Sequence, residues 1–249
     1  MPDRLNDYPA SHRAWPPPER PWVGRFIWRD LLFAHWAVPA GALRPSVPSR
    51  MEIEEFDGTA WLGVVPFLMT DMRVRGLPPL PGLSRTLEIN VRTYVRVDGA
   101  PGVYFFSLDA ESWLAVVGAR LAYHLNYLRA RMSLRREGER IRYESRRVHR
   151  GAPPAGFRGT YEPAGASFFS KPSSLEHWLT ERYALFAPDR RGRIYRGDIH
   201  HGQWPLQPAH AEFEHNAMTE QIGVTLPGDR PLLHYSGVLD VLVWPAREV

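Results

Sequence analysis

Residues 87–95 read Leu-Glu-Ile-Asn-Val-Arg-Thr-Tyr-Val, and this alternation of apolar and polar side chains predicts a β-strand. Successive side chains of a strand point to opposite faces of the sheet. One face therefore carries an acid, an amide, a guanidinium and a phenol, from Glu88, Asn90, Arg92 and Tyr94. The other face carries Ile89, Val91, Thr93 and Val95. We expect this second face to pack on the core.

The polar face of this strand is expected to line an internal pocket. The predicted neighbouring strands, 60–67 and 103–108, are apolar on both faces, as central strands of a covered sheet are. Buried Glu88 and Arg92 would then need each other or a ligand, because an unpaired buried charge is very costly. Two alternatives stay open: a structural ion-pair network and a solvated strand face.

The composition indicates one soluble, β-rich domain with a short N-terminal arm. The chain has 249 residues, of which 44% are hydrophobic and 12% aromatic, enough for a sizeable core. Residues 1–20 are polar and proline-rich, so we expect an arm there and a single domain over residues 21–249. No run approaches the roughly 18 to 20 apolar residues that cross a bilayer, and no signal-peptide pattern is present. With no cysteine in the chain, these features favour a cytoplasmic protein.

The arginine content raises the question of nucleic-acid binding. The net charge is +4, and arginines are concentrated between Arg129 and Arg150. That segment alternates in polarity and turns at Glu137-Gly138, which predicts a hairpin with its arginines on the solvated face. Elsewhere the arginines are interleaved with Asp and Glu. We expect no nucleic-acid partner, and regulatory binding through this hairpin stays as an alternative hypothesis.

Few helices are expected. Residues 111–123 carry apolar side chains about one turn apart, which predicts a helix. A second helix is predicted over 174–186, capped by Ser173 or Ser174 and ended by Pro188. Residues 51–56 and 60–70, separated by Asp57-Gly58, predict a hairpin.

Several segments resemble the uncharacterised YqjF-like bacterial family. In order along the chain, the matching segments are residues 32–39, 43–45, 47–48, 57–61, 65–67, 88–95 and 102–109. That family is similar in fold to acetoacetate decarboxylase. The resemblance implies a mostly β (α+β) fold, a cone-like or barrel-like arrangement of antiparallel strands with a few helices around a central cavity. It also implies that the Glu88 strand lines this cavity, and it places His124 and Tyr127 near the cavity mouth.

The resemblance does not extend to the decarboxylase nucleophile. Acetoacetate decarboxylase uses a lysine that forms a Schiff base with the keto acid and is kept neutral by desolvation and a cationic neighbour. The matching position here, 124–127, contains no lysine, and the only lysine, Lys171, lies far downstream. Glu88 matches the catalytic glutamate of acetoacetate decarboxylase. The active-site arginine of that enzyme would fall near Ala37 in this chain, although Arg92 could supply a cation from another position. We expect no Schiff-base decarboxylation and assign no catalytic residue.

Seven residues are candidates for the pocket. They are Glu88, Asn90, Arg92, Tyr94, His35, His124 and Tyr127. Arg92 is expected to hold an anion, Glu88 to orient the ligand or exchange a proton with it, and Asn90 and Tyr94 to supply hydrogen bonds. His35 lies on an apolar strand, where a histidine is more often a core residue than a base.

No cofactor and no metal is expected. Phosphate-binding glycine loops are missing, and the histidines at 200, 201, 210 and 215 show no fixed ligand periodicity. The preferred hypothesis is a pocket that either binds or converts a small anionic or carbonyl compound. The alternative is a non-catalytic structural or interaction protein with an ion-paired core. The sequence does not specify an oligomeric state, for which a symmetric homodimer is the commonest default.

Overall fold

Strands dominate the computed structural model, which describes residues 9–79, 84–113, 116–117, 120, 123–228 and 230–249. The strands are β1 (Gly24–Val38), β2 (Glu52–Ile53), β3 (Ala60–Val74), β4 (Arg85–Val97), β5 (Ala100–Ala110), β6 (Tyr127–Glu137), β7 (Arg140–Arg147), β8 (Gly156–Pro163), β9 (Ala184–Pro188), β10 (Ile194–His201), β11 (Gln207–Asn216), β12 (Leu232–Val243) and β13 (Arg247–Glu248). The short helical elements are α1 (Ala40–Leu43), η2 (Arg44–Ser46), α3 (Leu175–Thr180) and η3 (Glu220–Ile222). The predicted mostly β fold is confirmed.

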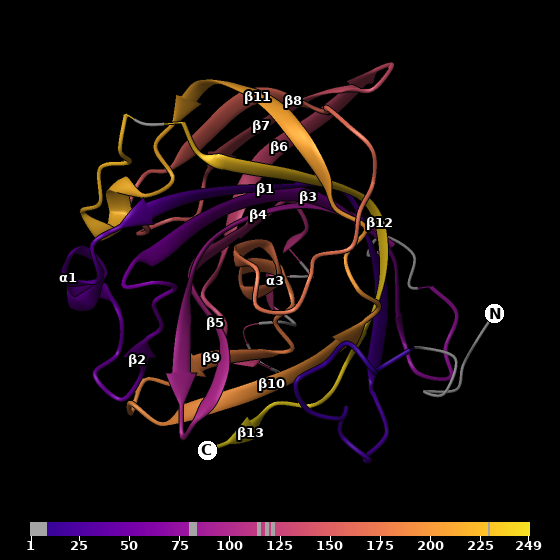
Figure 1. Cartoon of the computed structure of the whole chain (residues 1–249), viewed down its shortest axis with the longest axis vertical. Helices are drawn as coiled ribbons and strands as arrows, with labels where there is room; N and C mark the ends of the chain where they lie inside the picture. The colour runs from indigo at the N-terminus through magenta and orange to yellow at the C-terminus, as the bar shows by residue number, and fades with distance from the viewer. Residues whose placement is uncertain (1–8, 80–83, 114–115, 118–119, 121–122, 229) are drawn as a thin grey trace.

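The strands form one sheet that forks at both edges of a five-stranded wall (Figure 1). The wall has the order β12-β1-β3-β4-β5, and its neighbouring strands are antiparallel. β5 pairs with β9 through residues 103–104 and with β6 through residues 108–110, and both pairings are parallel. β12 pairs with β11 near its start and with β10 near its end. The β9–β10 branch therefore closes over one face of the wall, and the β6–β7–β8–β11 branch closes over the other.

The apolar face of β4 packs into the main core, as predicted. This face is fully or almost fully buried and clusters with side chains from the second branch; the residues concerned are Leu87, Ile89, Val91, Val95, Tyr143, Phe157 and Tyr161. Burying an aliphatic side chain of this size contributes about 1.5–3 kcal/mol relative to leaving it exposed. The opposite face of the wall carries further buried apolar clusters, built mainly from β1 and β3, and the polar groups of β4 lie among them beneath the β9–β10 branch.

The second predicted helix is shorter than expected. α3 ends at Thr180, and the Ser174 hydroxyl accepts a hydrogen bond from the backbone N–H of His177 (3.3 Å). Residues 184–188 form β9 instead, because β5 and β10 offer pairing partners on its two sides. Pro188 therefore ends a strand. Within the predicted helix over 111–123, residues 113, 116, 117, 120 and 123 are helical, residues 111 and 112 are not, and the remaining positions lie outside the described residues.

The predicted hairpin at 51–70 is only partly formed. Asp57 and Gly58 have φ angles of 48° and 74°, and they turn the chain between the bridged residues Phe56 and Thr59. Beyond this bridge β2 pairs with β4 and not with β3. The reason is that both edges of β3 are already occupied, by β1 and β4.

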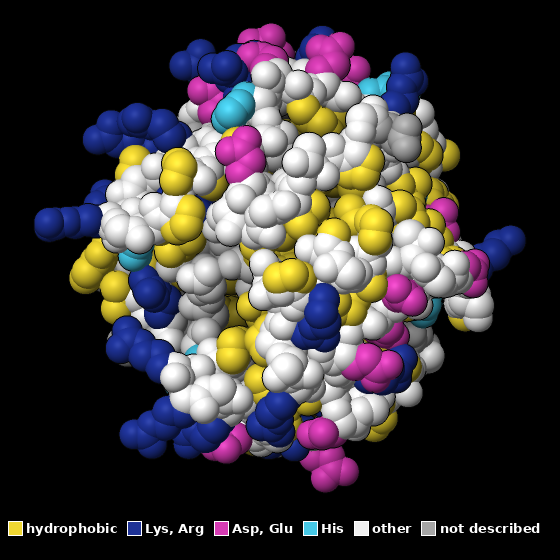
Figure 2. Space-filling view, turned by 90° about the vertical axis from the view of Figure 1, so that its left-hand side faces the viewer, with side chains coloured by type: hydrophobic (Ala, Val, Ile, Leu, Met, Phe, Trp, Pro, Cys, Tyr) yellow, Lys and Arg dark blue, Asp and Glu magenta, His cyan; other side chains and the backbone are white. Residues whose placement is uncertain are grey.

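The arginine-rich segment forms the β6–β7 hairpin, as predicted. On its solvated side, Arg140 and Arg142 of β7 form ion pairs with Glu212 and Glu214 of β11 (2.9 and 2.7 Å). Basic and acidic side chains are also interspersed at the top and lower right of the face shown in Figure 2. Within the described chain, no helix is long and apolar enough to span a membrane.

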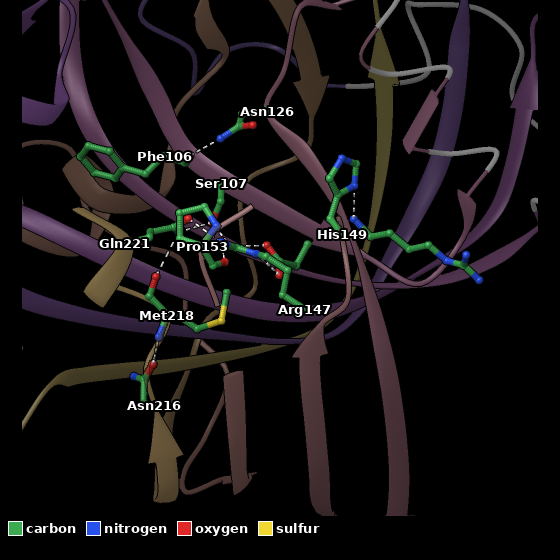
Figure 3. Close-up of polar contacts among 11 residues, drawn as sticks. Phe106, Ser107, Asn126, Arg147, His149, Pro153, Asn216, Met218 and Gln221 are labelled. Atoms are coloured by element: carbon green, nitrogen blue, oxygen red, sulfur yellow. Dashed lines mark hydrogen bonds and ion pairs between the residues drawn. The ribbon is translucent and has the colours of Figure 1, made fainter. Parts of the chain in front are cut away.

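Arg147 departs from the expectation that the arginines of this hairpin face solvent. Its guanidinium is buried and donates to both oxygens of Asp109, at 2.7 and 2.9 Å, and to the Gln221 side chain at 2.6 Å (Figure 3). Asp109 of β5 points to the same side of the wall as Ile89, its partner in the register. The molecule therefore has an ion-paired core, on the side of the wall opposite to Glu88.

The described part of the N-terminal arm packs against β10. Arg13 is buried; it donates to the Ile199 carbonyl (2.8 Å) and its guanidinium lies 4.0 Å from the centre of the Tyr183 ring. His12 lies 3.1 Å from the His201 carbonyl. These contacts fasten residues 12 and 13 to the outside of the β9–β10 branch.

Candidate functional site

A cavity of about 440 Å³ lies between the wall and the β9–β10 branch. Its lining comes mainly from β1, β3, β4, β5 and β10. α3 closes one end, where Thr180 and Arg182 belong to the lining. The Tyr94 hydroxyl donates a hydrogen bond to the Leu179 carbonyl (2.8 Å), which fixes the end of α3 to β4.

The polar face of β4 supplies a stripe of this lining. Thr86, Glu88, Asn90 and Arg92 all belong to it. Most of the other residues that line the cavity are apolar or aromatic. Among them, the rings of Trp28 and Trp204 stack with centroids 5.4 Å apart. The expected polar lining is therefore one stripe in a largely apolar cavity.

Glu88 is buried and sits near the middle of the stripe. The Tyr127 hydroxyl donates a 2.8 Å hydrogen bond to its carboxylate. Burial raises the pKa of Glu88 from 4.5 to about 7, and hydrogen bonds from Tyr127 and Asn90 oppose this rise. A carboxyl group with this pKa can both give and take a proton near neutrality.

Asn90 lines the cavity and carries a buried acceptor without a partner in the described chain. The residue is only 4% exposed, and its Oδ1 has no hydrogen-bond partner among the described residues. A buried polar atom left unpaired costs free energy of the order of 1–3 kcal/mol. A ligand that donates a hydrogen bond at this point would recover part of that cost.

Arg92 is a cation of the cavity lining that lacks a carboxylate partner among the described residues. In the described part of the chain it forms no ion pair, and its buried Nε has no hydrogen-bond partner. Its guanidinium lies 5.1 Å from the centre of the Phe33 ring and 3.5 Å from the Tyr94 hydroxyl. The structural alternative required Glu88 and Arg92 to neutralise each other, and no such ion pair is present among these residues.

Arg182 is a lining residue that the sequence did not single out. It forms an ion pair with Glu54 (2.6 Å) and lies over the Trp178 ring (4.4 Å), while its Nη2 has no partner among the described residues. The position of Arg182 depends on where α3 ends and on its hydrogen bond to Glu54, which lies 128 residues earlier in the sequence. No local sequence signal carries that information.

Tyr94 and His35 are both described, but neither belongs to the residues that line the cavity; they lie behind that lining. The Nε2 of His35 is 2.6 Å from the Tyr94 hydroxyl. Because the Tyr94 proton is donated to Leu179, His35 must carry its proton on Nε2 and donate it to Tyr94. Burial, together with Arg92, lowers the pKa of His35 well below 6.5. Tyr94 therefore positions Arg92 and α3 and has no proton to offer a ligand.

The two remaining candidates, His124 and Tyr127, lie in different places. Tyr127 is buried and lines the cavity beside Glu88. His124 is exposed, has a φ of 54° and packs against the Tyr195 ring at 4.2 Å. His124 is not among the described residues that line the cavity, although its neighbours Tyr123 and Leu125 are, and its place near the mouth stays a prediction. Lys171 is exposed before α3 and is absent from the lining, so no lysine reaches Glu88.

His201 is a further lining residue missed at the sequence level. It is buried, and desolvation lowers its pKa from 6.5 to about 3, so it is neutral. Its ring centroid lies 5.1 Å from that of Trp204, so it extends the aromatic wall opposite the polar stripe. Across the described ranges, no three His, Cys, Asp or Glu side chains are grouped so that they could hold a metal ion.

Comparisons with known proteins assign this chain to a family and relate its fold to solved structures. It is 46% identical to the "Uncharacterized protein YqjF" of Bacillus subtilis (strain 168) over 231 residues, which cover 93% of this chain and 94% of that protein. Its fold is similar to that of acetoacetate decarboxylase from Legionella pneumophila, with a TM-score of 0.60, 16% identity and coverage of 95% and 92% of the two chains. It is also similar to the enduracididine biosynthesis enzyme MppR complexed with pyruvate, with a TM-score of 0.61, 11% identity and coverage of 94% and 91%. A family model of uncharacterized conserved proteins, DUF2071, matches residues 25–240. The chain therefore belongs to the DUF2071 family and has an acetoacetate decarboxylase-like fold.

Proposed function

We propose that the cavity binds a small anionic or carbonyl compound, with Arg92 as the cation that holds it. The observation that carries this proposal is the guanidinium of Arg92, which faces the cavity without a carboxylate partner in the described chain. A buried or partly buried cation is normally paired, so a site that keeps one unpaired is suited to an anion. The pyruvate complex of MppR, which shares the fold, supports a carbonyl acid as the first class to test.

Glu88 is proposed as the proton-exchanging group of the same site. Its pKa of about 7 leaves comparable amounts of acid and carboxylate near neutral pH. The chain offers no lysine in the cavity, so any conversion there would use acid–base chemistry and not a Schiff base. Asn90 and Arg182 add one acceptor and one donor that lack partners among the described side chains.

The test is ligand-induced stabilisation of the wild type and of Arg92→Gln, with pyruvate and other small carboxylates. A ligand at a hundred times its Kd stabilises by about 2.7 kcal/mol, which for a chain of this size raises Tm by roughly 5–10 °C. Arg92→Gln should lose this shift and Arg92→Lys should keep part of it. The matched control is Arg135→Gln, an exposed arginine of β6. The proposal fails if no carboxylate shifts the wild type, or if folded Arg92→Gln shifts as much as the wild type.

A further inference from the structure

The cavity is elongated along β4. The register places Thr86 opposite Met69 of β3 and Arg92 opposite Gly63 of β3. Six residues of extended strand separate Thr86 from Arg92, a span of about 20 Å. The cavity follows this whole length, because Thr86 and Arg92 both belong to its lining.

The two ends of the cavity differ in exposure. Of the described lining residues only Val23 and Val74 are exposed, by 37% and 46%. They lie together, because Gly24, which follows Val23, is paired with Val74. The opposite end is closed by α3 and by the buried Arg182. The mouth is therefore at the start of β1, and the floor lies beneath Arg92.

Charge is also distributed unevenly along this axis. Arg25 near the mouth is neutralised by an ion pair with Asp240. Arg92 near the floor has no such partner in the described chain. The floor therefore offers an anionic group a cation that no described carboxylate occupies, and Arg73 at the mouth is the competing position that the experiment below tests.

Apart from Thr86 and the arginines at the mouth, the section between the mouth and Glu88 is apolar. Phe26, Trp28, Met69 and Met72 line it. At about 30 Å³ for each water-sized group, the volume of 440 Å³ holds about 15 non-hydrogen atoms. A three-carbon keto acid fills less than half of this space and leaves the apolar section empty. Apolar surface of this kind gains most when it is covered by an apolar ligand.

We infer that the ligand of this cavity is an elongated amphipathic acid, with its anionic group at Arg92 and its apolar chain or ring system extending toward Val23 and Val74. This inference rests on the proposed function and adds the class and orientation of the ligand. Glu88 then meets the ligand several bonds away from its anionic group, because the Cα atoms of Glu88 and Arg92 are about 13 Å apart along the strand.

Isothermal titration of the full chain with butanoate, hexanoate, octanoate and decanoate, below micelle formation and at one pH and ionic strength, tests this inference. Affinity should rise about three- to fourfold for each added methylene, or about a hundredfold from butanoate to octanoate. Octanol, which lacks the anion, should bind at least tenfold more weakly than octanoate. Arg92→Gln should weaken all four acids by a similar factor.

A pair of variants separates the apolar section from the anion site. Met72→Glu places a charge beside the expected chain, so it should weaken octanoate and leave butanoate nearly unchanged. The matched control is Val238→Glu, because Val238 of β12 is exposed and lies outside the residues that line the cavity. This control should affect neither acid.

The outcomes distinguish this inference from the proposed function. Binding that depends on Arg92 but does not tighten with chain length overturns the elongated ligand and leaves the anion site intact. Octanol binding as tightly as octanoate keeps the apolar section and overturns the anion site. Loss of binding in Arg73→Gln but not in Arg92→Gln overturns the orientation, because Arg73 lies at the mouth opposite Arg25. No binding at any chain length overturns the elongated ligand, and the separate test with pyruvate then decides whether the anion site stands.

Discussion

Replacing Glu88 by Gln should stabilise the protein at pH 8 and leave its stability nearly unchanged at pH 4.5. Burial raises the pKa of this carboxyl from 4.5 to about 7 in the folded protein, so the folded state holds the proton more tightly than the unfolded chain does. The associated stability is fully present below pH 4.5 and is lost as the pH rises toward 7. At 1.36 kcal/mol for each pH unit, this loss is about 3 kcal/mol. Gln carries no charge to desolvate, and its side-chain oxygen can still accept the Tyr127 hydrogen bond.

Denaturant unfolding at several pH values from 4.5 to 8 measures the effect. The free energy of unfolding of Glu88→Gln, minus that of the wild type, should grow between pH 4.5 and 7 and level off above pH 7. The matched control is Glu139→Gln, an exposed glutamate in the turn of the β6–β7 hairpin, for which this difference should stay near zero. A difference for Glu88→Gln that is constant across the range, or a variant less stable than the wild type at pH 8, would refute the assignment of a raised pKa to Glu88.

Three further predictions concern the groups around the cavity and the core. Tyr127→Phe removes a donor to the Glu88 carboxylate, so it should raise the pKa of Glu88 above 7, measured by infrared titration of the carboxyl band. Arg147→Met should lower the free energy of unfolding by about 3–5 kcal/mol, because it leaves Asp109 buried without its partner; the double variant with Asp109→Leu should recover much of this loss in the same denaturant titration. Ser174→Ala should cost about 1 kcal/mol in that assay through loss of the α3 cap, and an unchanged midpoint would contradict that role.

The period-two pattern of residues 87–95 was sufficient to predict the wall strand and its two faces. A strand period assigns side chains to faces without knowledge of the partner strands, and the apolar neighbours at 60–67 and 103–108 indicated that both faces are covered. Glu88, Asn90 and Arg92 could therefore be placed together from sequence alone. That they bind a ligand is still a prediction.

The other parts of the site depend on contacts between residues distant in sequence. Arg182 lines the cavity only because α3 stops at Thr180 and Glu54 holds the guanidinium. The helical signal at 174–186 could not reveal this stop, because strand pairing with β5 and β10 overrides local propensity. His124 is exposed while its neighbours Tyr123 and Leu125 line the cavity, and its positive φ is a local feature that a sequence pattern does not show.

Arg92 is held in place by contacts that need no ligand. A Cβ atom on Gly63 would approach the Arg92 side chain to 3.2 Å and the His35 ring to 3.1 Å, so the absence of a side chain at this position makes room for both. The hydrogen bonds from His35 to Tyr94 and from Tyr94 to Leu179 fix the phenol against which Arg92 rests. The guanidinium of Arg92 is thus confined before any anion arrives, and binding does not have to pay again for ordering it. Buried apolar clusters on both faces of the wall hold β4 in place, so the position of Arg92 does not depend on a ligand.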